Sequence, residues 1–251
     1  MQWQNFKGGL NQLKIEGNEV HIWLIPSDKI INEISFFEDL LSQNELSRAG
    51  RFYFEMDKNK FIVGRGILRL IISKYSGIFP TQINFIYNEF GKPSLEKGQN
   101  SMFLEFNTSH SASFVTIGIT IIAQIGIDIE TLDRKFDLLE LAKRYFAEGE
   151  YTKLSSLPKE LLTEGFYNCW TRKEAFIKAI GNGLSHPLDT FEVTLTPDEK
   201  TRFLKIAGEN VEEWSLINIK PHSEYVGAIA INRKSNELKY LYLDDYRVLL
   251  N

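Results

Sequence analysis

Two acidic residues, Asp128 and Glu130, lie in the stretch "IGIDIE" (125–130). If this stretch is a strand, both carboxylates and Gly126 share one face, and the three isoleucines share the other. Carboxylates two residues apart are roughly 6–7 Å apart at the backbone, and their oxygens can converge on one hard cation such as Mg²⁺. Taken alone, the pair is a weak signal, and a strand end with a solvated acidic face is its more common explanation.

A second charged group lies in "TRKEAFIKAIGNG" (171–183), which has helical spacing of its apolar residues. Trp170, Glu174 and Lys178 are four residues apart and therefore share one helix face. Glu174 could complete a three-carboxylate metal site, and Lys173 and Lys178 could hold phosphates that the metal bridges. The alternative is an exposed Glu–Lys pair, worth only about 0.2–0.5 kcal/mol.

Three earlier stretches carry further polar residues. In "NTSHSAS", Ser109 and His110 could both donate to an anion, although a core histidine bonded to a carbonyl is an equal alternative. A Ser–His hydrolase is disfavoured, because no Gly-x-Ser-x-Gly elbow occurs. Lys92 stands in the turn "FGKPSL", and Arg48 and Arg51 stand in "ELSRAGRF". Each of these three cations alone would be interpreted as a surface charge.

The elements that must position these residues follow from periodicity and turn signals. We expect a strand over Asn18–Pro26, a helix around Lys60–Tyr75 ending at Gly77, and a helix over Phe166–Ile180 broken by "GNG". "QINFIYNEFGKPSL" predicts a strand and a Gly-Lys-Pro turn, and "FNTSHSASFVTIGIT" begins a pair of β-branched runs that resembles a hairpin.

The second half of the chain repeats this order loosely. "INIKPHSEYVGAIAIN" resembles "FNTSHSASFVTIGIT", and "KAIGNGLSHPLDTFEV" parallels "SKYSGIFPTQINF". Chance similarity is an open alternative to duplication. A true duplication predicts an α+β fold of two similar subdomains, 1–122 and 123–251, each a small antiparallel sheet packed with helices. Clefts between such halves are favoured ligand sites.

Composition excludes several protein classes. The 251 residues are 43% hydrophobic and 25% charged, with a net charge of −4, which disfavours a general nucleic-acid or membrane binder. A single cysteine, Cys169, excludes an internal disulfide and fits a reducing compartment. No cysteine–histidine cluster suggests zinc. We see no signal peptide and no apolar run long enough for a bilayer, and we expect a cytoplasmic protein.

Five motifs together carry a family resemblance. "GRGILR", "FGKP", "NTSHS", "IGIDIE" and "WTRKEAFIKAIGNGL" occur in the order and approximate spacing of the 4′-phosphopantetheinyl transferases. The resemblance runs from about Glu45 to about Leu195, and "GIDIE" with "WTRKEAFIKA" is its specific part. The length and paired halves resemble the surfactin-type branch, whose members are pseudo-dimers in one chain; the short trimeric holo-acyl-carrier-protein synthases lack the N-terminal half.

The resemblance implies transfer of the 4′-phosphopantetheine arm of coenzyme A to a serine of an apo acyl or peptidyl carrier protein, with release of 3′,5′-ADP. It implies Mg²⁺, with Mn²⁺ as an alternative, and coenzyme A as co-substrate. We also expect a monomer with no nucleic-acid or membrane partner. The sequence does not identify the carrier, which could serve fatty-acid, polyketide or nonribosomal-peptide synthesis, or the tolerance for acyl-coenzyme A.

The resemblance also assigns residues. The metal ligands would be Asp128, Glu130 and Glu174, of which Asp128 would also contact the cofactor. The phosphate contacts would be Lys173 and Lys178. The adenine-side 3′-phosphate would be held by Ser109, His110 and the turn Gly91, Lys92 and Pro93, with Arg48 nearby. The chain departs from the family at Glu45, where some members have a lysine, so that contact is in doubt.

For the chemistry, Lys178 would neutralise charge on the leaving phosphate, and the carrier serine needs a base. Glu150, Glu174 and a metal-bound water remain as alternatives for that base. A non-catalytic coenzyme A or carrier-binding module would be expected to have lost a metal carboxylate, and all three are present. A metal-dependent phosphohydrolase would need more His or Asp ligands, and only His110 of the four histidines lies in a motif.

Overall fold

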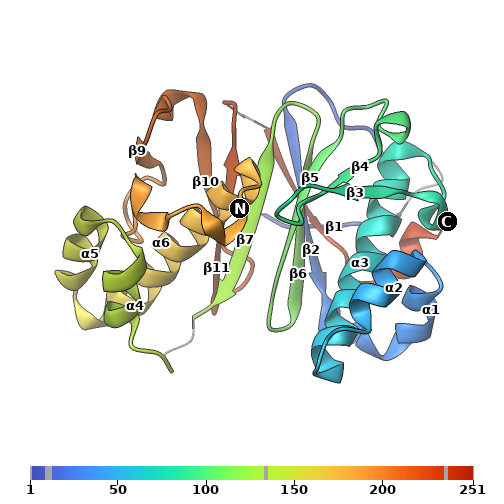
Figure 1. Cartoon of the computed structure of the whole chain (residues 1–251), viewed down its shortest axis with the longest axis horizontal. Coiled ribbons are helices and arrows are strands. Elements are labelled where there is room, and N and C mark those ends of the chain that lie inside the picture. The colour runs from blue at the N-terminus through green and yellow to red at the C-terminus, as the bar shows by residue number, and fades with distance from the viewer. Residues whose placement is uncertain (1, 9–12, 133–134, 235–236, 251) are drawn as a thin grey trace.

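The structure is a computed structural model that describes residues 2–8, 13–132, 135–234 and 237–250. It is an α+β fold in which two sheets stand back to back, with a group of helices on each outer side (Figure 1). None of the helices in these four ranges is long and apolar enough to cross a membrane. The strand predicted over Asn18–Pro26 and the two helices predicted to end near Gly77 and Ile180 are all present.

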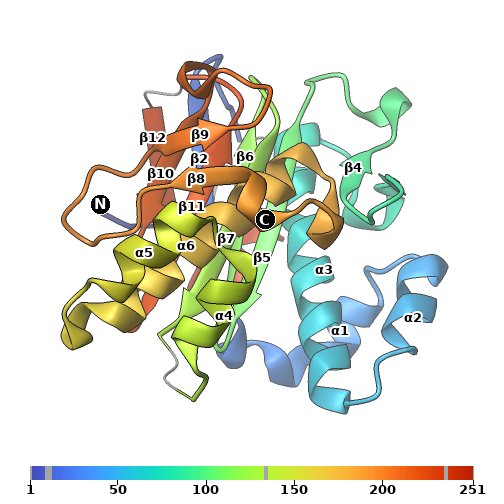
Figure 2. The same ribbon diagram turned by 60° about the vertical axis from the view of Figure 1, so that its left-hand side comes forward.

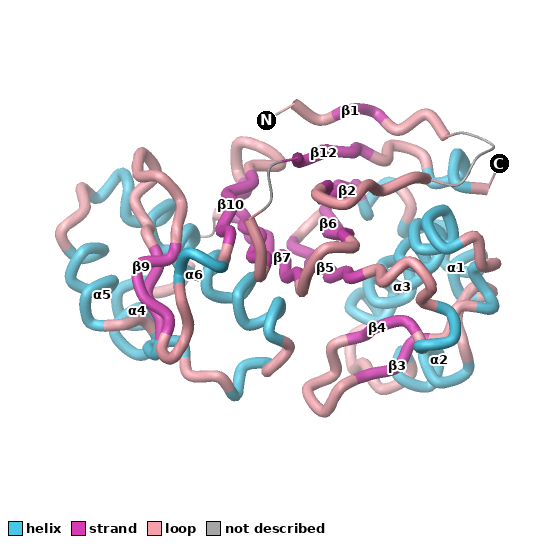
Figure 3. The backbone as a smooth tube through the Cα atoms, turned by 90° about the horizontal axis from the view of Figure 1, so that it is seen from above, coloured by secondary structure: helices cyan, strands magenta, loops and turns pink. Residues whose placement is uncertain are grey.

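The first sheet has five strands, which follow one another when the chain is seen from above (Figure 3). In order they are β1 (Gln4–Asn5), β12 (Glu237–Tyr242), β2 (Glu19–Pro26), β6 (Phe114–Thr120) and β5 (Glu105–Ser111). The helices on its outer side are α1 (Ile34–Glu38), α2 (Gln43–Ala49) and α3 (Glu55–Ser76). The pairs β1–β12 and β12–β2 are parallel, and the other two pairs are antiparallel.

The C-terminal segment belongs to this first sheet, which differs from the expected division into 1–122 and 123–251. Strand β12 pairs with β2 over its whole length, so the chain returns to the N-terminal half. Tyr246 then packs against Phe36 and Phe37 of α1, and Leu243 and Leu249 join the same core. The return buries apolar side chains that would otherwise face water.

The second sheet has three antiparallel strands, and α6 packs across β7 and β11. Its strands are β10 (Ser215–Ile219), β11 (Tyr225–Ile231) and β7 (Ile125–Thr131). Its helices are α4 (Leu138–Tyr145), α5 (Glu148–Ser155) and α6 (Lys159–Ile180). Two small hairpins complete the fold, β3 (Phe85–Tyr87) with β4 (Pro93–Leu95) and β8 (Phe191–Val193) with β9 (Phe203–Ile206).

Three apolar cores hold these layers together. One lies between the first sheet and α3, and another lies between the second sheet and α6. The third joins the two sheets, and it contains Ile125, Ile127 and Ile129 from β7 together with Val20 and Ile22 from β2. The alternation predicted for "IGIDIE" is therefore confirmed, because the isoleucines face the other sheet.

Strands β5 and β7 lie side by side at the junction of the two halves (Figure 2). Backbone amides of β7 donate here to side chains of β5: Ile127 N–H to Asn107 (3.1 Å), Ile129 N–H to Ser109 (3.4 Å) and Thr131 N–H to Ser111 (3.2 Å). The three acceptors are alternate residues of β5 and therefore share one face. Side chains thus join the two sheets where no strand pairing connects them among the described residues.

Helix α6 crosses β7 at very short range because residue 126 is a glycine. A Cβ atom at Gly126 would lie 2.0 Å from the carbonyl oxygen of Ala175 and 2.3 Å from the backbone nitrogen of Ala179. Any side chain at this position must therefore push the helix away from the strand. This approach brings the carboxylates of β7 to the face of α6.

We predict that Gly126→Ala lowers the free energy of unfolding by about 3 kcal/mol, the upper part of the usual range for overpacking. Urea unfolding followed by circular dichroism measures the change. Gly98→Ala is the matched control, because nothing lies within 4 Å of its added Cβ. A Gly126→Ala protein as stable as the control would contradict the close approach of α6.

Candidate active site

A cleft of about 580 Å³ opens between the two halves. Its walls come from α2 and α3, the β3–β4 turn, β5, β7 and α6. The lining residues include Arg48, Phe61, Arg65, Gly91, Lys92, Pro93, Ser109, His110, Asp128, Glu130, Trp170, Glu174 and Lys178. The cleft therefore brings together most of the residues that the sequence singled out, from five separate segments.

Asp128 is the buried centre of a polar triangle. One of its oxygens, Oδ1, accepts from Ser109 Oγ (2.7 Å) and from Lys178 Nζ (2.7 Å). Lys178 Nζ also donates to Ser109 Oγ (3.0 Å), which closes the triangle across the junction between the halves. The second oxygen, Oδ2, is buried and has no hydrogen-bond partner within the described ranges.

Glu130 and Glu174 add two carboxylates beside Asp128. Burial and the negative charge of Asp128 together raise the pKa of Glu130 to about 7, against a hydrogen bond from Ser111 (2.8 Å). Burial also raises the pKa of Glu174, again with help from Asp128 and against Lys178. The Oε1 atom of Glu174 is buried without a partner in the part of the chain that the structure describes. Three carboxylates thus share one cation, Lys178.

This excess of negative charge suits a divalent cation. Within the described residues, no group of three carboxylate, histidine or cysteine side chains is arranged to hold an ion by itself. Mg²⁺ does not require such a cage, because it binds through one or two carboxylates and takes its other oxygens from water or phosphate. The partnerless oxygens of Asp128 and Glu174 are free for that role, with Glu130 beside them. The donor set therefore fits Mg²⁺ completed by ligand oxygens.

Lys173 and Glu150 are not brought to the cleft, in contrast to their expected roles as phosphate contact and base. Both are buried and pair with each other at 2.7 Å. Lys173 Nζ also donates to the carbonyls of Leu188 (2.6 Å) and Phe191 (2.6 Å), and Glu150 accepts from the amide of Val193 (2.8 Å). Adjacent residues of a helix do not face the same way, so Lys173 points into the core where Glu174 points into the cleft.

The Gly-Lys-Pro turn lines the cleft, but its lysine is engaged inside the protein. Lys92 Nζ donates to the carbonyls of Ile125 (3.2 Å) and Ala179 (2.7 Å). A cation at the carbonyl end of α6 is favoured by the helix dipole. Lys92 therefore ties the turn to β7 and α6 instead of pointing its ammonium at a ligand. Gly91 has φ of 83°, which a glycine adopts without strain.

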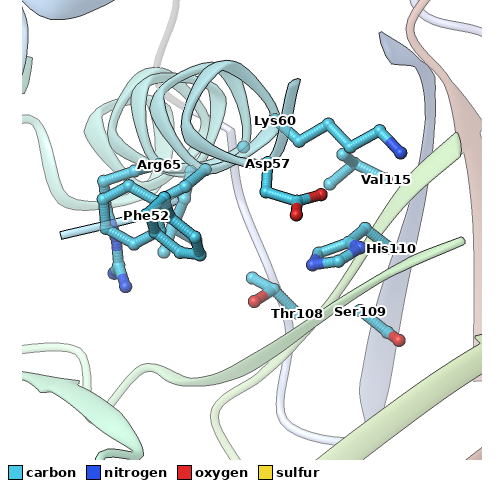
Figure 4. A pocket seen from close by; sticks show the side chains of 11 residues that line it. Phe52, Asp57, Lys60, Arg65, Thr108, Ser109, His110 and Val115 are labelled. Atoms are coloured by element: carbon cyan, nitrogen blue, oxygen red, sulfur yellow. The ribbon is translucent and has the colours of Figure 1, made fainter. Parts of the chain in front are cut away.

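His110 stands at the end of β5, between the cleft and a smaller cavity of about 180 Å³ that α3 covers (Figure 4). Partial burial lowers the pKa of His110, and Lys178 and Lys60 lower it further. The imidazole is therefore mainly neutral near pH 7, and an anion placed beside it would raise its pKa again.

Sequence reasoning missed Arg65 and Phe61 as lining residues. Arg65 lies in the motif "GRGILR", which was the only signal, and the motif alone did not give the residue a role. In Figure 4, Arg65 reaches into the smaller cavity from α3, across from Thr108 and His110 on β5.

Comparisons with known proteins show which family the chain is similar to. The family model described as the 4′-phosphopantetheinyl transferase superfamily matches residues 124–230, and that described as 4′-phosphopantetheinyl transferase, N-terminal, matches residues 27–121. The chain is 39% identical over 219 residues to the 4′-phosphopantetheinyl transferase HetI of Nostoc sp., covering 87% of this chain and 90% of that protein. It is 36% identical over 162 residues to Sfp of Bacillus subtilis, covering 64% and 70%.

We predict that Glu174→Gln stabilises the protein in the absence of divalent metal. Above pH 5 the glutamate is charged in the unfolded chain, and its raised pKa means that this charge is disfavoured in the folded state. The neutral amide should therefore raise the free energy of unfolding by about 0.5–1 kcal/mol at pH 8, and the gain should vanish near pH 4. Thermal unfolding in EDTA measures the effect.

The same experiment tests the metal site. Added Mg²⁺ should raise the unfolding midpoint of the original protein, because it binds the folded state only, and this shift should be lost in Glu174→Gln. Glu160→Gln, an exposed site on the same helix, should keep the shift. Equal Mg²⁺ shifts in all three proteins would contradict the site.

Proposed function

The chain belongs to the 4′-phosphopantetheinyl transferase superfamily, in the branch of Sfp and HetI, and we propose that it transfers the phosphopantetheine arm of coenzyme A to a carrier-protein serine in a Mg²⁺-dependent reaction that releases 3′,5′-ADP. The observation that carries this proposal is the meeting of Asp128, Ser109 and Lys178 across the junction of the two halves. That arrangement supplies metal-binding carboxylates and phosphate-binding donors in one cleft.

The diphosphate of coenzyme A would lie against Lys178 and Ser109, with His110 beside it. Mg²⁺ would be held by Asp128 and Glu174 with Glu130, and it would neutralise charge on the diphosphate. Because Lys178 already lies 2.7 Å from Asp128, its ammonium is held in place before the substrate binds. A donor fixed in advance stabilises developing charge without reorganisation during the reaction.

In the reaction, the serine oxygen of the carrier attacks the phosphorus that bears the pantetheine arm. The bond between that phosphorus and the oxygen bridging to the nucleotide breaks, and Lys178 donates to the phosphate that leaves. The serine proton needs an acceptor. Glu174 is our candidate, because it lines the cleft and burial raises its pKa, whereas Glu150 is occupied by Lys173.

A recess beside the end of the cleft that carries Glu130 supports a docking site for the carrier. It has a volume of about 260 Å³ and shares Glu130 and Trp170 with the cleft. Its other walls are mainly apolar, and Phe136 at its edge is 61% exposed. We propose that the carrier presents its serine from this recess, and that apolar contact outweighs charge steering on a chain of net charge −4.

We also propose that the two halves are a duplicated unit with pseudo-twofold symmetry and that the protein acts as a monomer. Helices α3 and α6 both have 22 residues and both end at a glycine with a left-handed backbone. The three-strand orders β5–β6–β2 and β10–β11–β7 are antiparallel and occupy equivalent places in the chain. These likenesses support duplication better than the loose sequence match does.

Mass spectrometry of apo carriers incubated with the protein, coenzyme A and Mg²⁺ tests the function, since each modified carrier gains the mass of one phosphopantetheine. We predict that Asp128→Asn lowers the rate at least about a hundredfold, because it weakens both the metal site and the hold on Lys178. Asp198→Asn, an exposed carboxylate, should retain the original rate. A folded Asp128→Asn protein with near-normal activity would refute the proposed site.

The docking proposal has its own test. Phe136→Ala should raise the Michaelis constant for the carrier about tenfold, through loss of an aromatic anchor, and leave that for coenzyme A unchanged. Phe79→Ala removes an equally exposed aromatic, 71% exposed, outside the recess and should change neither constant. If Phe136→Ala leaves the Michaelis constant for the carrier unchanged, the carrier does not dock in this recess.

A further inference from the structure

The turn between β3 and β4 is attached to the other half of the chain by Asn88. The Nδ2 atom of Asn88 donates to the carbonyl of Gly181 (2.8 Å), the residue that ends α6. Its Oδ1 atom accepts from the backbone amides of Phe90 (3.0 Å) and Lys92 (2.8 Å). One side-chain amide therefore fixes the shape of the turn and also attaches the turn to α6.

The two kinds of bond have different consequences. Strands β3 and β4 have three residues each and form a separate two-stranded sheet, and such a hairpin is only marginally stable by itself in water. The bond from the Phe90 amide is an Asx turn, which stabilises the local shape of the chain. The bond to Gly181 joins residues that are 93 positions apart, so it determines where the turn lies relative to the other half.

The "GNG" sequence after α6 provides the surface on which the turn rests. Gly181 and Gly183 have φ of 76° and 58°, which side chains other than glycine rarely adopt. A Cβ atom at Gly181 would lie 3.0 Å from Asn88 Nδ2 and 3.2 Å from Lys92 Cδ, and one at Gly183 would lie 3.4 Å from Phe90 Cβ. The glycines thus allow the turn to approach the end of α6 closely.

This contact forms one wall of the cleft. The turn contributes residues 90–93 to the lining, and the segment after α6 contributes Gly181 and Gly183. Lys178 lies on the last turn of the same helix and lines the cleft beside them. The wall is therefore shared between the two halves, and it exists only while the turn stays against the end of α6. A wall that is formed before binding adds affinity, because the ligand does not have to order it.

We propose that Asn88 is a positioning residue for coenzyme A, which acts by holding the β3–β4 turn against Gly181 before the coenzyme binds. Asn88 is not one of the residues that line the cleft, so its effect reaches the ligand through the turn. This inference rests on the proposed function, since it presumes that coenzyme A occupies the cleft.

Direct binding to Asn88→Asp tests the inference. The carboxylate still accepts from the two turn amides, but it cannot donate to Gly181 and it places a negative charge beside that carbonyl oxygen. The dissociation constant of adenosine 3′,5′-bisphosphate, the nucleotide part of coenzyme A, should rise about 5- to 10-fold, the usual effect of one lost hydrogen bond. Isothermal titration calorimetry measures this constant.

Kinetics separate positioning from catalysis. In Asn88→Asp the Michaelis constant for coenzyme A should rise by the same factor, whereas kcat and the Michaelis constant for the carrier should change less than about twofold. Asn88→Ser is the second variant, and it is used alone if Asn88→Asp does not fold. Its hydroxyl can accept from the Phe90 amide in the same type of turn but is too short to reach Gly181, so it should show the same rise.

Asn100→Asp is the matched control. Asn100 Nδ2 donates to the carbonyl of Leu104 (3.2 Å) and its Oδ1 accepts from the amide of Leu104 (2.7 Å), so the same chemistry occurs within the N-terminal half. Asn100 does not line the cleft. Asn100→Asp should therefore lower the unfolding midpoint in the same way while leaving the nucleotide affinity unchanged.

The outcomes distinguish the two proposals. The role of Asn88 is wrong if its variants bind the bisphosphate within twofold of the original protein, if they lose kcat alone, or if Asn100→Asp weakens binding equally. The transferase assignment would survive each of these results. If the original protein neither binds the bisphosphate nor modifies a carrier in the presence of coenzyme A and Mg²⁺, the proposed function itself fails.

Discussion

The active site depends on the side-chain ladder that joins β5 to β7. Backbone pairing satisfies one edge of β7 through β11, and the amides of the other edge donate to Asn107, Ser109 and Ser111. Buried amides need such partners, so these three residues satisfy the free edge of β7 where the two sheets meet. The hydroxyl of Ser109 also donates a hydrogen bond to Asp128, and the hydroxyl of Ser111 donates one to Glu130. The same hydroxyl groups therefore join the two halves and orient the two carboxylates that we propose as metal ligands.

The sequence predicted the parts of this site that follow from local periodicity. A strand period of two places Asp128 and Glu130 on one face, and a helix spacing of four places Glu174 and Lys178 on another. What local patterns do not contain is the distance between the two elements, which Gly126 determines by admitting the backbone of α6. The return of β12 to β2 was missed for a similar reason, because the pairing spans most of the chain.

The charged residues that sequence reasoning misplaced have one feature in common. Lys173, Lys92 and Glu150 all bond to backbone groups of the fold, and a sequence does not distinguish a lysine that binds phosphate from one that binds carbonyls. Arg65 shows the opposite case. An arginine within an amphipathic helix is ordinarily solvated, whereas Arg65 is buried and its Nη1 has no hydrogen-bond partner among the described residues.

The buried pair of Lys173 and Glu150 still serves the site, although neither residue lies in it. Such a pair adds little net stability, because desolvation offsets its attraction, but breaking it by removing one partner costs about 3–5 kcal/mol. Lys173 reaches two carbonyls and one carboxylate at the same time, which fixes the rotation of α6 about its own axis. Rotation of the helix would move Glu174 and Lys178 out of the cleft while leaving an unpaired charge in the core. The internal ion pair therefore holds the face of α6 that carries Glu174 and Lys178 toward β7.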